Sequence, residues 1–177
     1  MIKYFFLPLI LVLVSGCTSA PKPQKEMPPK KKHHHKVVKI KPLFQTVPES
    51  KATLVQSGKN RLHCVVCGMN LVKYYKTSHT AKVDENEEQY CSLHCLAAQL
   101  NEGEELRNPK VVDVTTLKLI PVQNAYYVVG SDVKGTMTQV SKYAFASLND
   151  AEAFQAKHGG RVVDFNEALR LAKQDFN

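Results

Sequence analysis

Four cysteines constrain this chain more than any other feature of its sequence. They form two close pairs, C-x2-C at Cys64 and Cys67 and C-x3-C at Cys91 and Cys95, and 23 residues separate the two pairs. Gly68 follows the first pair and permits a tight turn there. One helical turn separates Cys91 from Cys95, so both side chains can face the same point. Soft or borderline metal ions need thiolates that converge in this way.

Several kinds of site are compatible with this spacing. A closed zinc site would use all four thiolates, although the separation of 23 residues and the C-x3-C pair lie outside the most regular pattern. A thioredoxin-like redox pair at Cys64 and Cys67 would require a helix N-terminus in a βαβ unit, whereas strands are expected on both sides. Two structural disulfides would suit an oxidising compartment. A transferable Cu(I) site would combine thiolates with thioethers in an incomplete shell.

Methionines and histidines near the cysteines are further candidate ligands. Besides the initiator, the chain has three methionines, of which Met27 lies far from the cysteines, Met69 follows the first pair, and Met137 stands in the segment GTMTQ. Neither Met69 nor Met137 belongs to an obvious apolar stripe, so both are candidate thioether ligands besides being candidate packing residues. His63 and His94 neighbour the thiols and could ligate a metal or support its ligands.

The N-terminus has the pattern of a bacterial secretory signal. Residues 1–16, MIKYFFLPLILVLVSG, combine an early lysine with an apolar run that is too short to span a bilayer. The stretch VSGC that ends at Cys17 resembles the lipobox of bacterial lipoproteins. This resemblance implies that Cys17 is acylated and anchors the protein to membrane lipid. Because Thr18 rather than Asp follows, we expect the periplasmic face of the outer membrane.

Residues 17–60 read as a flexible tether that carries the basic charge of the chain. Residues 18–60 contain ten Lys and two Glu, whereas residues 61–177 have a net charge of −1. The composition, rich in Lys and Pro, does not favour a packed core. A basic tether fits a membrane surface with anionic lipids, and the nearly neutral remainder argues against nucleic-acid binding. The run His33-His34-His35 could hold metal loosely or be low-complexity sequence.

A faint internal repeat predicts the fold of residues 61–177. QYCSLHCLAAQL before PKVVDVTT is matched by KYAFASLNDAEAFQAKHGG before RVVDFNEAL. Both halves suggest two strands, a helix that follows Ser-Leu, and a Val-Val-Asp strand. We therefore expect an α+β fold with two related lobes of mostly antiparallel strands, at residues 61–115 and 116–177. The elements expected are strands at 71–75, 77–83, 111–114 and 126–129, a helix from Leu93, a second helix capped by Asn149 or Asp150 and ended by Gly159-Gly160, and a terminal helix at 165–173.

These segments together resemble the NosL lipoproteins. The resemblance rests on CVVCGM, YCSLHC, GTM and the block YAFASLNDAEAFQAKHGGRVVDF, and the first half also looks like the small TRASH and YHS metal-binding modules. It implies an envelope Cu(I) chaperone without enzymatic activity, whose partner is a copper transporter or a copper-accepting enzyme such as nitrous oxide reductase. By motif match, the ligands would be the cysteines of the first pair with Met69 and Met137.

Two features depart from this family pattern. Four clustered thiols exceed what one transferable metal needs, and Thr138 stands where a second glycine is expected after Met137. The alternative is therefore a lipoprotein with a structural four-thiolate zinc module (Cys64, Cys67, Cys91 and Cys95) that serves protein binding or heavy-metal sequestration. The sequence shows no Ser-His-Asp pattern, phosphate-binding loop or carboxylate dyad, which leaves no hydrolase or kinase hypothesis to pursue.

Overall fold

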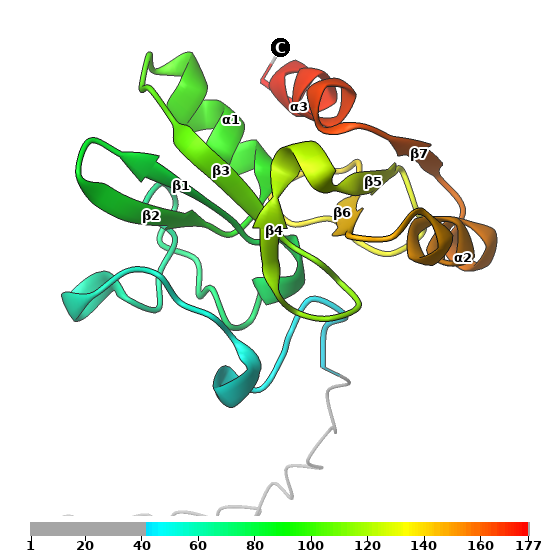
Figure 1. Cartoon of the computed structure of the whole chain (residues 1–177), viewed down its shortest axis with the longest axis horizontal. Coiled ribbons are helices and arrows are strands. Elements are labelled where there is room, and N and C mark those ends of the chain that lie inside the picture. Colours follow the sequence, from blue (N-terminus) through cyan, green and yellow to red (C-terminus); the bar gives the residue numbers. More distant parts are fainter. Residues whose placement is uncertain (1–41, 177) are drawn as a thin grey trace, which may run out of the picture. The chain divides into compact units, whose positions relative to one another are not determined.

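The first half of the folded region is an antiparallel sheet with one helix packed against it (Figure 1). The computed structural model describes residues 42–176. Strands β1 (His79–Val83), β2 (Asn86–Tyr90), β3 (Arg107–Val112) and β4 (Leu119–Pro121) lie in the order β2-β1-β3-β4. Helix α1 (Leu93–Asn101) connects β2 to β3. Since Cys91 follows β2 and Cys95 lies in the first turn of α1, this connection places the second cysteine pair.

The second half repeats the same topology. Strands β5 (Tyr126–Val129), β6 (Lys142–Phe145) and β7 (Arg161–Val163) form an antiparallel sheet in the order β6-β5-β7, and helix α2 (Leu148–His158) connects β6 to β7. The order β2-β1-β3 is thus repeated as β6-β5-β7. The predicted α+β fold with two strand-strand-helix-strand units is confirmed. A last helix, α3 (Phe165–Gln174), follows β7.

One apolar core joins the two units. Side chains of α1, β1, β3, β5, β6 and α3 belong to the same buried cluster, in which Leu93 and Leu96 of α1 lie with Tyr127 of β5 and with Ala168 and Ala172 of α3. The alanines of α3 permit close packing against α1, and Figure 1 shows the two helices side by side. The buried faces of both units therefore depend on each other, and α3 packs against α1 of the first unit and β5 of the second.

The segment around Leu71 differs from the sequence prediction. A strand was expected at 71–75, but these residues form turns that lead into a 3-10 helix at Tyr75–Thr77, and β1 begins only at His79. The reason lies in Asn70, whose side-chain oxygen accepts a hydrogen bond from Lys73 N at 2.9 Å. This local bond gives the backbone an alternative to a sheet ladder. The alternating pattern of side chains was therefore a misleading signal for a strand here.

The start of α2 also differs from the prediction. The expected cap was Asn149 or Asp150, whereas the helix begins at Leu148 with Ser147 in the N-cap position. Ser92 holds the equivalent position before Leu93 in α1. The Ser-Leu pair thus marks the same helix start in both units. The predicted end at Gly159 is confirmed, because this residue has a φ of 70° and terminates α2.

Residues 42–57, here called the strap, pack against both units although the sequence placed them in the tether. The side chain of Val47 is buried, and the amide of Gln45 donates to the carbonyl oxygen of Lys134 at 2.6 Å. Thr53 N donates to the hydroxyl of Tyr75 at 2.9 Å. Short 3-10 turns occur within and after it, at Glu49–Lys51 and Gly58–Asn60, and another precedes β5 at Val122–Asn124. Ordered structure therefore begins before residue 61.

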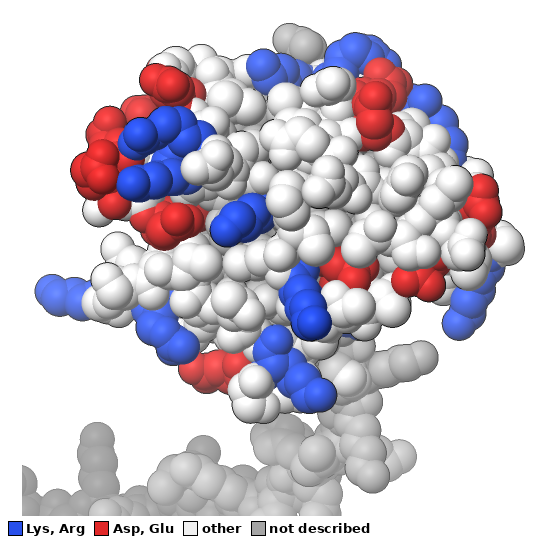
Figure 2. All heavy atoms as spheres, viewed as in Figure 1, with Lys and Arg blue, Asp and Glu red and all other residues white. Residues whose placement is uncertain are grey.

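The surface of this region is mixed in charge. On the face shown in Figure 2, acidic and basic side chains are interspersed around a broad area without charged residues. Residues 42–176 contain no helix that is both long enough and apolar enough to cross a membrane. The predicted signal (1–16), the lipidation site Cys17 and the run His33–His35 lie outside the described residues.

Asp113 provides a test of how the two units are joined. Its buried carboxylate, at the end of β3, accepts hydrogen bonds from Thr115 N, from Thr116 N and from Ala146 N of the second unit. We expect Asp113→Ala to lower the free energy of unfolding by about 3 kcal/mol, because three backbone N–H groups lose a buried, charged acceptor. Asp132→Ala, at an exposed ion pair with His158, should cost less than about 1 kcal/mol. Urea denaturation measures both, and equal losses would contradict this role.

Candidate metal centre

A tight turn over residues 61–70, here called the knuckle, presents the first two thiols. Its ends are held by the bond from Leu71 N to Leu62 O at 2.8 Å. Inside the turn, Cys64 N donates to Met69 O at 2.9 Å and Gly68 N donates to Cys64 O at 2.9 Å. Gly68 has a φ of 72°, a conformation that side chains disfavour. The glycine after the first pair therefore closes the turn, as the sequence indicated.

Strand β2 places the knuckle beside the second cysteine pair. Val65 N, between the first two cysteines, donates to the carbonyl oxygen of Gln89 at 3.2 Å. The fully buried amide of Gln89 also donates to Thr53 O and to Ser78 Oγ, and it accepts from Val55 N. The residue before the end of β2 thus holds both the knuckle and the strap. Cys91 follows two positions later.

The start of α1 presents the other two thiols. Ser92 is the N-cap, and its hydroxyl accepts a hydrogen bond from Cys95 N at 3.5 Å. This cap fixes the first turn of the helix, so Cys91 and Cys95 face the same point as their spacing predicted. Their sulfur atoms are 3.7 Å apart. The N-terminal end of a helix also carries a partial positive charge that favours a thiolate there.

All four thiols lie in one cluster. The Sγ atoms of Cys64, Cys67, Cys91 and Cys95 all lie within 4.8 Å of one another. Cys67 Sγ is 3.5 Å from Cys91 Sγ and 3.6 Å from Cys95 Sγ. Four sulfurs at about 2.3 Å from a tetrahedral metal would be about 3.8 Å apart, so these distances leave room for one metal ion. The structure has the four as free thiols rather than two disulfides.

Access to the cluster is one-sided. Cys64, Cys91 and Cys95 are buried in the core of the domain, whereas Cys67 is half-buried. Val65 and Val66, which lie between the two knuckle cysteines, are exposed to 41% and 37%. A metal ion or a partner protein can therefore reach the cluster from the knuckle side, where Cys67 is the first thiol met.

The thiols strongly influence one another's ionisation. Hydrogen bonds from the thiols of Cys91 and Cys95 lower the pKa of Cys64 well below its ordinary value. Hydrogen bonding to Cys64, together with burial, raises the pKa of Cys91 and of Cys95. The cluster therefore accepts one negative charge readily and resists further ones until a cation arrives. A metal ion that binds here must displace the protons of Cys91 and Cys95.

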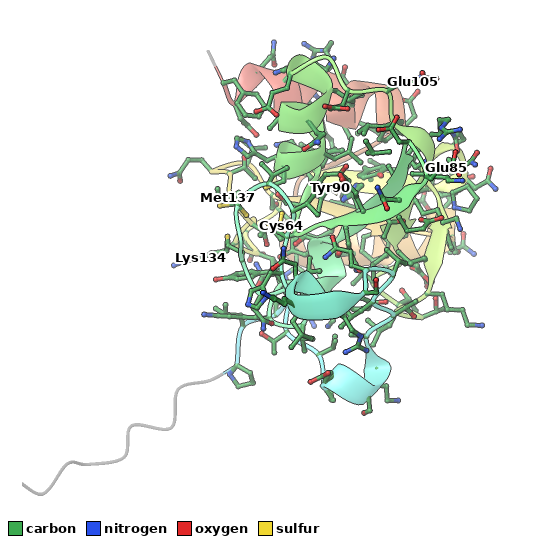
Figure 3. The ribbon with its side chains drawn as sticks, turned by 90° about the vertical axis from the view of Figure 1, so that its left-hand side faces the viewer. Cys64, Glu85, Tyr90, Glu105, Lys134 and Met137 are labelled. Atoms are coloured by element: carbon green, nitrogen blue, oxygen red, sulfur yellow. The ribbon has the colours of Figure 1, made fainter. Side chains whose placement is uncertain are left out.

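The two candidate thioethers occupy different positions. Met69 is partly buried and packs against the same core as the thiols, while its carbonyl closes the knuckle. Met137 lies in a loop of the second unit, with its side chain 43% exposed. The structure links this loop to the cluster through Thr77, whose hydroxyl lies 2.8 Å from Cys91 O and 2.8 Å from Thr136 Oγ1. Figure 3 shows Met137 towards the same edge of the molecule as Cys64.

The two neighbouring histidines are not alike. His63 is exposed, and its backbone takes part in the knuckle through a bridge with Asn70. The Nδ1 atom of His94 is buried and has no hydrogen-bond partner among residues 42–176. It lies 3.8 Å from Asp175 Oδ2, and the ring stacks on Phe176 at 4.3 Å. His94 therefore faces the C-terminal end of α3.

Sequence reasoning missed several residues that build the site. Gln89, Thr77 and Thr136 are polar residues without recognisable motif spacing, and they act through partners that are 11 to 59 residues away. Only Ser92 had a detectable signal, since a serine directly before an amphipathic run is a common helix cap. The thioredoxin hypothesis loses its structural basis, because turns rather than a helix follow the Cys64–Cys67 pair.

Comparison with known proteins supports the family resemblance. The sequence model of the NosL family matches residues 56–170. The copper-binding lipoprotein NosL of Stutzerimonas stutzeri is 49% identical over 57 residues, which are 32% of this chain and 30% of that protein. The HTH-type transcriptional repressor CutR of Bacillus subtilis (strain 168) is 31% identical over 94 residues, 52% of this chain and 50% of that protein. The chain thus spans half or less of either relative.

A solved structure shows the same fold. The crystal structure of the copper chaperone NosL from Shewanella denitrificans aligns with a TM-score of 0.51 and 24% sequence identity. The alignment covers 68% of this chain and 96% of that one. Since the family model matches more than half of the chain, including both cysteine pairs and Met137, the chain belongs to the NosL family.

Proposed function

We propose that this protein binds Cu(I) at the four-cysteine cluster and passes it to a copper-accepting protein of the bacterial envelope. One observation carries the proposal: four free thiols converge within 4.8 Å, three buried and one, Cys67, half-buried. Such a site can hold a soft metal firmly and still offer it to a partner. The work consists of binding and ligand exchange, so no enzymatic step is needed.

Copper is favoured by the ligand types. Cu(I) prefers thiolates and thioethers, and both occur here. Met69 packs against the apolar core that contains the buried thiols, and the loop of Met137 is linked to the thiol cluster through Thr136 and Thr77. The related proteins named above are described as a copper-binding lipoprotein and a copper chaperone. We assign the four cysteines as the main ligands and the two methionines as auxiliary ones.

Transfer would start at Cys67. A thiolate of the acceptor can bind the metal on the knuckle side while the buried thiols still hold it, and the metal then moves by successive ligand exchange. Val65 and Val66 offer an exposed apolar contact at this point. The family resemblance makes nitrous oxide reductase, or a copper transporter that serves it, the acceptor to test first.

We further propose the cellular setting from the sequence. Acylation of Cys17 after removal of residues 1–16 would anchor the protein to membrane lipid at the periplasmic face of the outer membrane. The basic residues that follow would lie near the lipid headgroups. Within this proposal the anchor keeps the chaperone close to envelope partners and leaves residues 61–115 free to exchange metal, with residues 116–177 contributing Met137.

A structural zinc site is the second candidate. It is favoured by the sulfur separations of 3.5 to 3.7 Å, which suit tetrahedral coordination by four thiolates. In that case the metal would stabilise the fold, and the protein would act through protein binding or by sequestering heavy metals. The two candidates differ in which metal is retained and in what happens when it is removed.

The first prediction concerns Cu(I) affinity. In an anaerobic titration against a competing chelator, we expect the purified chain to bind Cu(I). The double variant Cys64→Ser, Cys67→Ser should bind it more than about 100-fold less tightly, since groups that only orient ligands already contribute about 10–100-fold. Cys17→Ser, a cysteine change outside the cluster, should bind as the parent does. Equal affinity of the double variant and the parent would refute the proposal.

The second prediction separates copper from zinc. Protein purified without air and loaded with zinc should release the zinc on addition of one equivalent of Cu(I), because thiolate sites favour Cu(I). Elemental analysis after gel filtration gives both metals, and circular dichroism follows the fold. A structural zinc site would instead keep one zinc per chain in the presence of Cu(I), and it would unfold when a chelator removed the metal.

The third prediction concerns pH. The raised pKa values of Cys91 and Cys95 keep both thiols protonated near neutral pH, so metal binding must release at least these two protons. Apparent affinity should therefore rise with pH, by about 100-fold per unit for these two protons. Cys64, whose pKa is lowered, adds no such dependence at neutral pH. Calorimetric titrations in buffers of different ionisation enthalpy count the protons, and a count of zero would exclude this description.

A further inference from the structure

We propose that a partly buried ion pair between Lys142 and Asp175 positions Met137 for the metal held by the thiols. Lys142 begins β6, Asp175 follows α3, and neither belongs to the candidate ligands. The proposal rests on the function proposed above, in which Met137 is an auxiliary thioether ligand. It assigns to the ion pair the task of holding the loop of residues 135–141, here called the methionine loop.

The methionine loop is tightly wound, and Met137 has a disfavoured backbone. A side chain at Gly135 would lie 2.9 Å from Thr138 O and 3.1 Å from Ser141 Cα, so the loop folds back closely on itself. Met137 has a φ of 60°, in the left-handed region that non-glycine residues avoid. Its side chain is 43% exposed, so burial does not explain the conformation. Such backbone outliers persist only where surrounding contacts impose them.

The contacts that impose this conformation converge on Lys142. The side chain of this lysine is only 3% exposed, and its ammonium group donates to Asp175 Oδ2 at 2.9 Å. It also donates to Val140 O at 3.1 Å and lies 3.4 Å from Thr138 Oγ1. The hydroxyl of Thr138 in turn donates to Asp175 Oδ2 at 2.7 Å. All contacts of the ammonium group therefore join the methionine loop to the end of α3.

An ion pair with a buried ammonium group is a poor device for stability alone. Desolvation offsets much of the attraction between its charges, and apolar residues of similar size often stabilise a fold as well or better. What the pair provides is a fixed geometry, because the three donors of the ammonium group must each meet an acceptor. Here two of those acceptors, on Thr138 and Val140, follow Met137 in the chain, and the third is Asp175. The arrangement thus suits the positioning of a loop.

The same network reaches the thiol cluster from two directions. On one side, Thr136 is linked through the hydroxyl of Thr77 to the carbonyl oxygen of Cys91. On the other, Asp175 lies 3.8 Å from the ring of His94, which belongs to α1 between Cys91 and Cys95. A cavity of about 10 Å³, near the lower limit for holding one water molecule, is lined by residues that include Thr77, His94, Thr136, Thr138 and Lys142.

The consequence is that Met137 is held relative to the thiols. Without the ammonium group, the loop would lose the contacts at Thr138 and Val140, and the left-handed backbone at Met137 could relax. A metal at the cluster would then retain its thiolates but lose the thioether. The loss of Lys142 should therefore resemble the loss of the Met137 sulfur itself.

A double-mutant cycle on the full chain tests this inference. Met137→Leu and Lys142→Met should each weaken Cu(I) binding by about 10-fold, and the double variant should be no weaker than either single variant. X-ray absorption should show one sulfur neighbour fewer around Cu(I) in each. Binding of Co(II), which favours thiolates over thioethers, should be unchanged, as read from its thiolate charge-transfer band. Lys134→Met removes an exposed charge next to the loop and should change nothing.

Each other result overturns the inference. If Lys142→Met weakens Cu(I) binding equally with and without Met137, or weakens Co(II) binding too, it acts through the fold or the thiols. If Met137→Leu binds Cu(I) normally, there is no thioether to position, although Cu(I) binding by the cysteines stands. Failure of the Cys64→Ser, Cys67→Ser test removes the proposed function itself. Should Lys142→Met not fold, Asp175→Asn replaces it in the cycle, since it removes the negative charge of the ion pair and keeps a side chain of the same size.

Discussion

The candidate metal centre depends on one residue of an edge strand, Gln89. Its carbonyl oxygen holds the knuckle through Val65 N, and its side chain holds the strap and Ser78. Cys91 lies two residues further along the same chain. The two cysteine pairs are therefore brought together by a short stretch of backbone rather than by a disulfide or by long-range apolar packing alone. The thiols can stay free and close because this scaffold is formed by hydrogen bonds around them.

The two units divide the candidate ligands between them. The sequence Tyr90-Cys91-Ser92-Leu93 corresponds to Phe145-Ala146-Ser147-Leu148 in the second unit, and Asp150 stands where Cys95 would be. The second unit thus keeps the helix start but not the thiols. Its distinctive part is the long connection from β5 to β6, which carries Met137, whereas β1 and β2 are joined by a short turn. The duplicated topology thereby places the four thiols and Met69 in one half and Met137 in the other.

The sequence predicted local features of the site well. Gly68 after the first cysteine pair predicted a tight turn, and the spacing of four residues between Cys91 and Cys95 predicted that both lie on one helix face. Both predictions succeeded because they depend on residues only a few positions apart. The same holds for the repeated Ser-Leu helix starts, although the cap of α2 was placed at Asn149 or Asp150. The strand expected at 71–75 failed for a local reason too, since a single hydrogen bond to the Asn70 side chain overrides the alternating pattern.

Contacts between residues far apart in the chain could not be predicted from the sequence. The two cysteine pairs share one cluster because of the order of the strands and the hydrogen bonds of Gln89. The strap is ordered because the side chains of Val47 and Gln45 are buried against the rest of the domain. The partnership of Lys142 with Asp175 joins positions 33 residues apart without any regular spacing. Such contacts depend on how the elements pack in three dimensions, which composition and periodicity do not encode.

The strap has a consequence for how copies of the chain can meet. The exposed edge of a sheet invites pairing with a strand of another molecule. At the end of β2 nearest the thiols, Gln89 N donates a hydrogen bond to the side-chain oxygen of Gln56, and the carbonyl oxygen of Gln89 accepts one from Val65 N. That edge offers no free backbone groups at Gln89 to a neighbouring strand. A strand of a second molecule therefore cannot extend the sheet at this point beside the thiols.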